Sequence, residues 1–130
     1  MEIPEIAPEE IKKILEFKSV IESDSINKAL SATNEPYEFY EEENITQFLQ
    51  QLDISGFNLI FDYQAWLEEQ SYEKLSDLDF LQKADLDTLR KLMTAHIRTE
   101  RFLTGHLKEQ FGNGYMAIFF ARLEELYQQM

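Results

Sequence analysis

The sequence contains no cysteine, which excludes disulfide bonds, thiolate metal sites and a cysteine nucleophile. It is also poor in residues that interrupt helices, with three prolines and four glycines. No apolar run approaches the roughly 20 residues that a membrane-spanning helix requires. The N-terminal Met-Glu-Ile-Pro-Glu-Ile lacks the basic and apolar regions of a signal peptide. We therefore expect a cytoplasmic protein with no membrane partner.

Positive charge is scarce, because 12 Lys and Arg residues stand against 25 Asp and Glu residues, for a formal net charge of −13. The imbalance lies mostly in residues 35–80, where twelve acids accompany Lys74 as the only base. Residues 81–130 hold seven bases and six acids. Because an acidic surface repels phosphate, we expect no direct binding to nucleic acid. The acidic stretch favours solubility, with docking to a basic partner as the alternative.

Apolar residues make up 44% of the sequence, including ten Phe and six Tyr, which is enough for one packed core. A chain of 130 residues has the size of a single domain. Apolar positions recur at the helical period along most of it. The spacing predicts helices over residues 8–23, 41–52, 62–70, 85–101 and 115–129, with shorter ones at 75–81 and 106–111. Asp62 and Asp85 are expected to cap two of them, and residues 24–36 to form a loop with room for a helical turn at 26–30.

Residues 57–61 form a short apolar run whose period fits either a strand or a buried connector. No partner strand is evident, which favours the connector. Gly56 is expected to end the preceding helix, and Gly112-Asn113-Gly114 to reverse the chain. The sequence thus predicts an all-α fold: a single-domain bundle of five or six helices over residues 1–130, with an extended segment around residues 57–61 left open.

The familiar catalytic and nucleotide-binding signatures are missing. The sequence has no G-x-G-x-x-G, P-loop or G-x-S-x-G motif, no calcium loop, and no histidine pair at the i,i+4 spacing of a helical zinc site. We therefore predict no metal and no cofactor, assign no catalytic residue, and lean away from an enzyme.

One polar cluster stands out within residues 94–107, which hold both histidines and two of the four arginines. Arg98 and Arg101 are i,i+3 neighbours on one helix face, and a bend at Gly105 would return His106 towards His96. Two guanidinium groups suit a phosphate or carboxylate, and an imidazole can move a proton near neutral pH. The alternative, which we favour, is structural: the arginines pair with acids on another helix.

The cluster also carries a resemblance. The sequence contains the run Thr94-x-His96-x-Arg98-x-x-Arg101-Phe102-x-x-Gly105-His106-Leu107, followed by Gly114 and Arg122-Leu123. This pattern resembles an uncharacterised bacterial family known as a domain of unknown function. An upstream Phe61-Asp62-Tyr63-x-x-Trp66 element extends the similar region to about residues 57–127, leaving a helix and loop over residues 1–40 outside it. Family members often have Trp where this chain has Tyr63, and His where it has Tyr115. The resemblance implies no activity, but it implies that Arg98, Arg101 and Gly105 matter together.

A structural role for the motif predicts specific contacts. Gly105 would permit a sharp bend, Phe102 would anchor that bend in the core, and Arg98 and Arg101 would tie it to the region near Asp62. The predicted structural residues are Asp62, Trp66, Phe102, Gly105 and Gly114.

Three functional hypotheses follow. We rank first a non-enzymatic domain that binds a protein partner or itself through its acidic face or an exposed aromatic patch. The alternative is a site for a small anion or phosphoryl compound at His96, Arg98, Arg101 and His106, with Glu100 as an orienting group or a base. Acidic mimicry of nucleic acid ranks third. Finding both arginines buried against carboxylates, with no adjoining cavity, would contradict the ligand site.

Overall fold

The computed structural model describes residues 3–23 and 42–130, and within these ranges the chain forms helices and no strand. The α-helices of seven or more residues are α1 (Pro8–Leu15), α4 (Glu43–Ile54), α5 (Tyr63–Gln70), α7 (Leu86–Thr99), α8 (His106–Gly112) and α9 (Tyr115–Gln128). Shorter elements are α2 (Lys18–Ile21), the 3₁₀ helix η2 (Tyr72–Ser76) and α6 (Leu78–Gln82). The predicted all-α class is confirmed. The expected helical turn at 26–30 lies outside the described residues.

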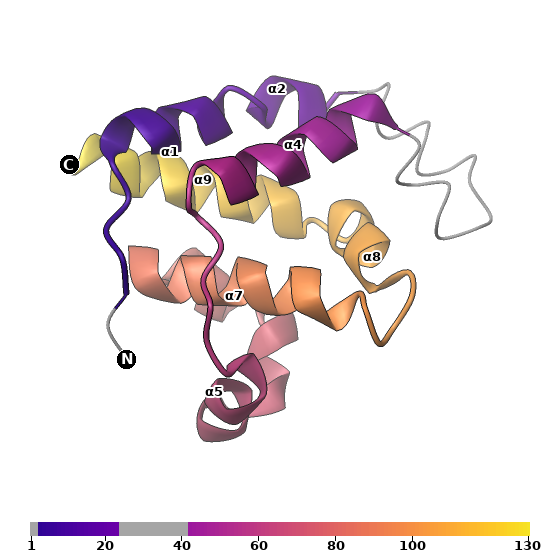
Figure 1. Ribbon diagram of the computed structural model, residues 1–130. Helices are drawn as coiled ribbons and strands as arrows, with labels where there is room; N and C mark the ends of the chain where they lie inside the picture. Colours follow the sequence, from indigo (N-terminus) through magenta and orange to yellow (C-terminus); the bar gives the residue numbers. More distant parts are fainter. Residues whose placement is uncertain (1–2, 24–41) are drawn as a thin grey trace.

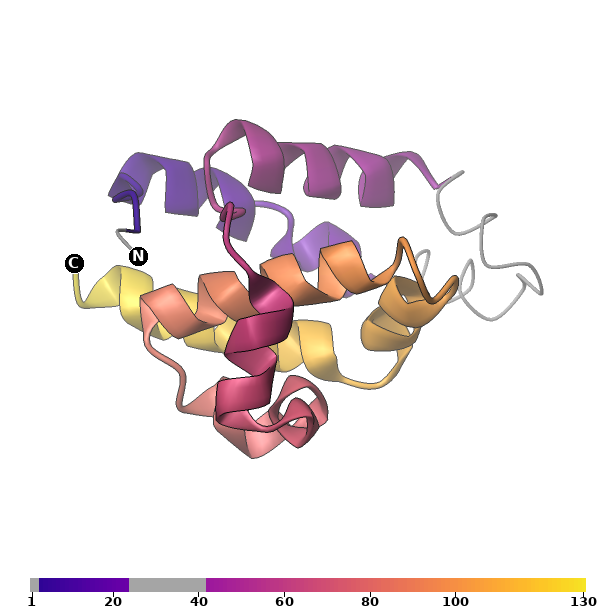
Figure 2. The same ribbon diagram turned by 60° about the horizontal axis from the view of Figure 1, so that its bottom comes forward.

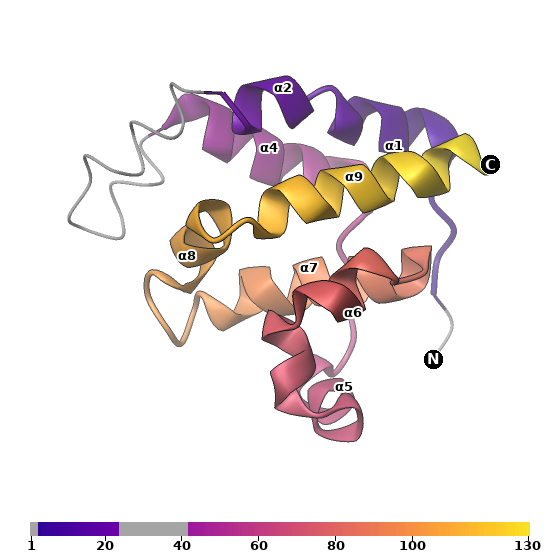
Figure 3. The ribbon, with the colours of Figure 1, turned by 180° about the vertical axis from the view of Figure 1, so that it is seen from behind.

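The helices surround one hydrophobic core with α9 at its centre (Figures 1 and 3). α9 packs against α1, α6, α7 and α8, while α4 packs against α1 and α2. Aromatic side chains join these layers, because the Phe120 ring lies 5.5 Å from Phe48 of α4 and the Phe119 ring lies 5.7 Å from Phe57. No described helix is long and apolar enough to cross a membrane.

Aspartates begin three of the helices. Asp62, Asp77 and Asp85 each accept a hydrogen bond from a backbone N–H in the first turn that follows, at 2.8–3.1 Å. The predicted caps at Asp62 and Asp85 are confirmed. Such a cap contributes about 1 kcal/mol, since it satisfies a donor that the helix leaves unpaired.

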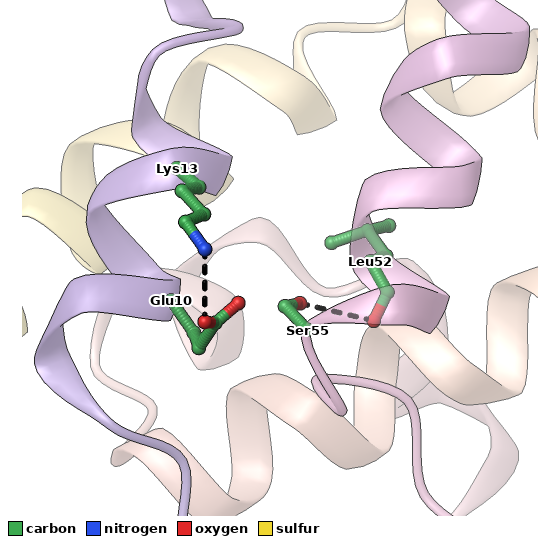
Figure 4. Close-up of polar contacts among 4 residues, drawn as sticks. All are labelled: Glu10, Lys13, Leu52 and Ser55. Atoms are coloured by element: carbon green, nitrogen blue, oxygen red, sulfur yellow. Dashed lines mark hydrogen bonds and ion pairs between the residues drawn. The ribbon is translucent and has the colours of Figure 1, made fainter.

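Helix ends differ from the prediction in three places. The expected helix over residues 8–23 is divided into α1 and α2 by a turn at Glu16 and Phe17, and α7 ends at Thr99 instead of Arg101. α4 spans Glu43–Ile54 instead of residues 41–52, and Gly56, with a left-handed φ of 78°, follows its end as expected. Figure 4 shows the Ser55 hydroxyl donating to the Leu52 carbonyl at that end, at 3.2 Å, beside the pair between Lys13 and Glu10 of α1.

Residues 56–61 form the predicted connector, which runs from α4 across α7 to α5 (Figures 1 and 2). Its backbone is hydrogen-bonded to side chains of α7. Arg90, 1% exposed, donates to the carbonyls of Phe57 at 3.1 Å and Gly56 at 2.9 Å. The Leu59 N–H donates to the hydroxyl of Thr94 at 3.0 Å.

Arg98 completes this row, donating to the carbonyl of Leu59 at 2.9 Å and to that of Phe61 at 3.5 Å. Arg90, Thr94 and Arg98 are spaced four residues apart and so share one face of α7. Arg90 also donates to the Pro4 carbonyl at 2.6 Å, which ties the segment before α1 to the same face. We call these three residues the α7 polar row.

Replacing Arg90 tests the row. We expect Arg90→Met to lower the free energy of unfolding by about 3–5 kcal/mol, because it leaves three backbone carbonyls without their donors. Arg101→Met is the matched control, since this exposed arginine follows the same helix and should change stability by less than about 0.5 kcal/mol. Urea unfolding followed by circular dichroism measures both variants. Equal stability of the two would contradict the structural role of Arg90.

Candidate functional site

The turn between α7 and α8 is held by the carboxylate of Glu100. Its two oxygens accept hydrogen bonds from the N–H groups of Gly105 and Leu107, each at 2.9 Å. Gly105 itself has a left-handed φ of 95°, which explains why glycine occupies this position. Glu100, predicted as an orienting group for a ligand, therefore caps the start of α8.

This bend brings the two histidines together, as the sequence suggested. His96 Nδ1 and His106 Nε2 lie 2.8 Å apart, and the rings are stacked with centroids 5.0 Å apart. One nitrogen donates and the other accepts, so this contact forms with both rings neutral, while His96 Nε2 is buried without a hydrogen-bond partner among the described residues. The ring of Tyr115, which stands where related sequences were expected to have His, meets His96 edge-on with centroids 4.5 Å apart.

Burial keeps the histidine pair uncharged at neutral pH. The side chain of His96 is 0% exposed, and this desolvation lowers its pKa to about 3, assisted by His106 and opposed by the Leu75 backbone. Burial also lowers the pKa of His106, against the opposing charges of Glu109 and Glu100. A neutral, mutually bonded pair in the core offers no charge to an anion, so the two histidines act within the fold.

The two arginines lie elsewhere, on a pocket of about 490 Å³ between α4 and α7. The described lining residues come from both helices and from the connector: Thr46, Leu49, Gln50, Asp53, Asn58, Thr94, Ile97, Arg98 and Arg101. The four-residue cluster predicted from the sequence is therefore divided, with Arg98 and Arg101 on the pocket and His96 and His106 in the core.

Neither arginine forms an ion pair with an acid in the part of the chain that the structure describes. Within residues 3–23 and 42–130, no carboxylate lies within 4.0 Å of Arg98 or Arg101. Arg98 bonds to two carbonyls that precede Asp62, while the carboxylate of Asp62 caps α5. The expected tie between the bend and this region is thus made by Arg98 through backbone atoms. The exposed side chain of Arg101 takes no part in it.

The predicted anchoring role of Phe102 is wrong, because its side chain is 77% exposed and that of Leu103 is 59% exposed. α7 ends three residues earlier, so Phe102 lies in the turn and no longer follows the buried helix face. Glu100 and the buried His106 hold the bend in its place. Trp66 is half-buried against Phe61, and Gly114, with φ of 91°, begins α9 at the predicted reversal.

Sequence reasoning missed Arg90 and Asn58. Arg90 lies four residues after Leu86 and three before Met93, on the apolar face of the helix predicted over residues 85–101. A single cation on an apolar face could have indicated a buried, hydrogen-bonded arginine. Asn58 sits within the predicted connector, where nothing in the pattern distinguishes it.

These features define an all-α protein with one core and a pocket, lined by two arginines, between two of its helices. The chain belongs to a family of unknown function, DUF6508, whose model matches residues 7–129. The match begins well before residue 57, where the resemblance noted from the sequence starts. No curated protein and no solved structure matches the chain.

The buried histidines predict a loss of stability in mild acid. Because the pKa of folded His96 lies below the unfolded value near 6.5, the unfolded state binds the proton more readily. The contribution of neutral His96 to the free energy of unfolding is therefore complete above a pH of about 6.5. It declines as the pH falls, by about 2 kcal/mol between pH 6.5 and 5. Urea unfolding across this range measures the slope, which His96→Asn should flatten. An unchanged slope in the variant would contradict the assignment.

A second experiment tests the Glu100 cap. We expect Glu100→Ala to speed hydrogen exchange of the Gly105 and Leu107 amides by about tenfold or more, since hydrogen bonds to a carboxylate contribute roughly 1.5–3 kcal/mol. Glu109→Ala is the control, because it removes the same charge from the exposed side of α8. Exchange followed by NMR would contradict the cap if both variants behaved alike.

Proposed function

We propose that the pocket between α4 and α7 binds a small ligand through an anionic group, a carboxylate or a phosphate. The observation that carries the proposal is Arg98, whose guanidinium is fixed by two backbone carbonyls and lines the pocket without a carboxylate partner among the described residues. Arg101 adds a second cation to the same pocket. Paired guanidinium groups match the geometry of carboxylate and phosphate oxygens.

The position of Arg98 is set before any ligand arrives. A guanidinium has five N–H donors, and the bonds to Leu59 and Phe61 use two of them. Because the side chain is already held in place, little conformational entropy is lost when a ligand takes the remaining donors. Preorganisation of this kind favours specific binding over transient ion pairing.

The size and lining of the pocket support a metabolite-sized ligand. Its volume of about 490 Å³ falls within the usual range for ligand pockets, roughly 300–1,000 Å³. Leu49 and Ile97 offer apolar contact, while Gln50 and Asn58 add polar side chains to the lining. The proposal keeps the arginines of the predicted ligand site and omits its histidines. It concerns binding alone and assigns no catalytic residue.

Ligand binding is tested with inorganic phosphate, citrate and glycerol 3-phosphate in NMR titrations. We expect Arg98→Met and Arg101→Met each to weaken binding by at least about tenfold, since a charge-assisted hydrogen bond contributes roughly 1.5–3 kcal/mol. Arg122→Met is the control, because this arginine donates to the Ala84 carbonyl and pairs with Glu125. Equal affinity in wild type and in the exposed Arg101→Met variant would refute the proposal without any question of misfolding.

Protein–protein interaction is the second candidate function. The observation that favours it is the adjacent pair Phe102 and Leu103, both exposed on the turn between α7 and α8. We propose that this turn mediates self-association of the chain, in the cytoplasmic setting that the sequence predicts. A dimer by light scattering that the double variant Phe102→Ser, Leu103→Ser converts to a monomer would support it, and a wild-type monomer at high concentration would exclude it.

A further inference from the structure

We propose that the ligand of this pocket is a zwitterion, an amino acid whose ammonium and carboxylate groups lie at opposite ends of the molecule. The inference rests on the proposed function and adds the second charge. It starts from Asp53, which lines the same pocket as Arg98 and Arg101. No described cation lies within ion-pair distance of its carboxylate.

The charges are separated along the pocket. α4 and α7 are antiparallel (Figures 1 and 2). The C-terminal part of the α4 lining therefore lies beside the N-terminal part of the α7 lining. Asp53, in the last turn of α4, therefore lies towards the Thr94 end of the pocket, whereas Arg101, just beyond the end of α7, lies towards the Thr46 end. One end of the pocket is acidic and the other is cationic.

Helix geometry gives the scale of this separation. Thr94 and Arg98 are four residues apart on α7, which is about 6 Å along the helix axis. An extended five-carbon amino acid separates its nitrogen from its carboxyl carbon by about 6 Å, from ordinary bond lengths. Such a molecule can place its carboxylate at Arg98 and its ammonium at Asp53.

Asp53 gives the pocket a means of selection. It repels a ligand that carries only negative charge, because the carboxylate of Asp53 and the ligand would lie in the same pocket. It attracts the ammonium group of a zwitterion. The carboxylate of Asp53 therefore disfavours a purely anionic ligand and favours a zwitterion. Leu49 and Ile97, which also line the pocket, provide apolar contact for the methylene chain between the charges.

A matched ligand pair tests this inference. 5-Aminopentanoate and pentanoate share the carboxylate and differ by the ammonium group, and their binding to the full chain can be followed by NMR titration. We expect the wild type to bind 5-aminopentanoate at least about tenfold more tightly, and Asp53→Asn to remove this difference by weakening 5-aminopentanoate and not pentanoate. Glu43→Gln is the control, because it removes the same charge from the exposed face of α4 outside the pocket.

The outcomes separate the two proposals. If pentanoate binds as tightly as 5-aminopentanoate, or if the preference survives in Asp53→Asn, the zwitterion is excluded while anion binding at the arginines stands. If neither compound binds, and inorganic phosphate and citrate do not bind either, both proposals fail. A preference that depends on Asp53 and on Arg101, and not on Glu43, establishes the zwitterion site.

Discussion

The hydrogen bonds of the α7 polar row are the interaction on which the rest of the structure depends. Residues 56–61 form no regular secondary structure and have no partner strand in the described chain, so their buried backbone groups must be satisfied by side chains. Arg90, Thr94 and Arg98 supply these bonds. Each buried carbonyl left unpaired would cost about 1–3 kcal/mol. Without the row, the connector that leads to α5 and the segment around Pro4 would both lose their side-chain hydrogen bonds to α7.

The same row produces the candidate site. Arg98 is held by carbonyl oxygens, which fix its geometry without cancelling its charge. A carboxylate partner would have held it equally well but would have neutralised it. The sequence left open whether Arg98 and Arg101 stabilise the fold or bind a ligand. The two arginines differ in this respect. Arg98 serves the connector and faces the pocket, whereas Arg101 faces the pocket alone.

Local features of the fold could be predicted from the sequence, and features that depend on distant partners could not. The caps at Asp62 and Asp85 and the turn at Gly114 were predictable because their geometry is set within three or four residues. The return of His106 to His96 followed from one glycine. Arg90 escaped notice because its acceptors are backbone carbonyls more than 30 residues away, which any residue could provide. Phe102 was misjudged because it lies in the turn after Thr99, where the helical period no longer indicates which side chains face the core.

The overall charge of the protein bears on which ligand the pocket can recruit. A chain with a formal net charge of −13 creates a negative field that slows the approach of an anion and lowers its local concentration. Two arginines can offset this field only at short range, since salt screens charges beyond about 8 Å at physiological ionic strength. A zwitterion has no net charge, so the field does not oppose its approach. Its ammonium and carboxylate groups interact with opposite charges only inside the pocket. The acidic surface and the mixed charges of the pocket thus favour the same class of ligand.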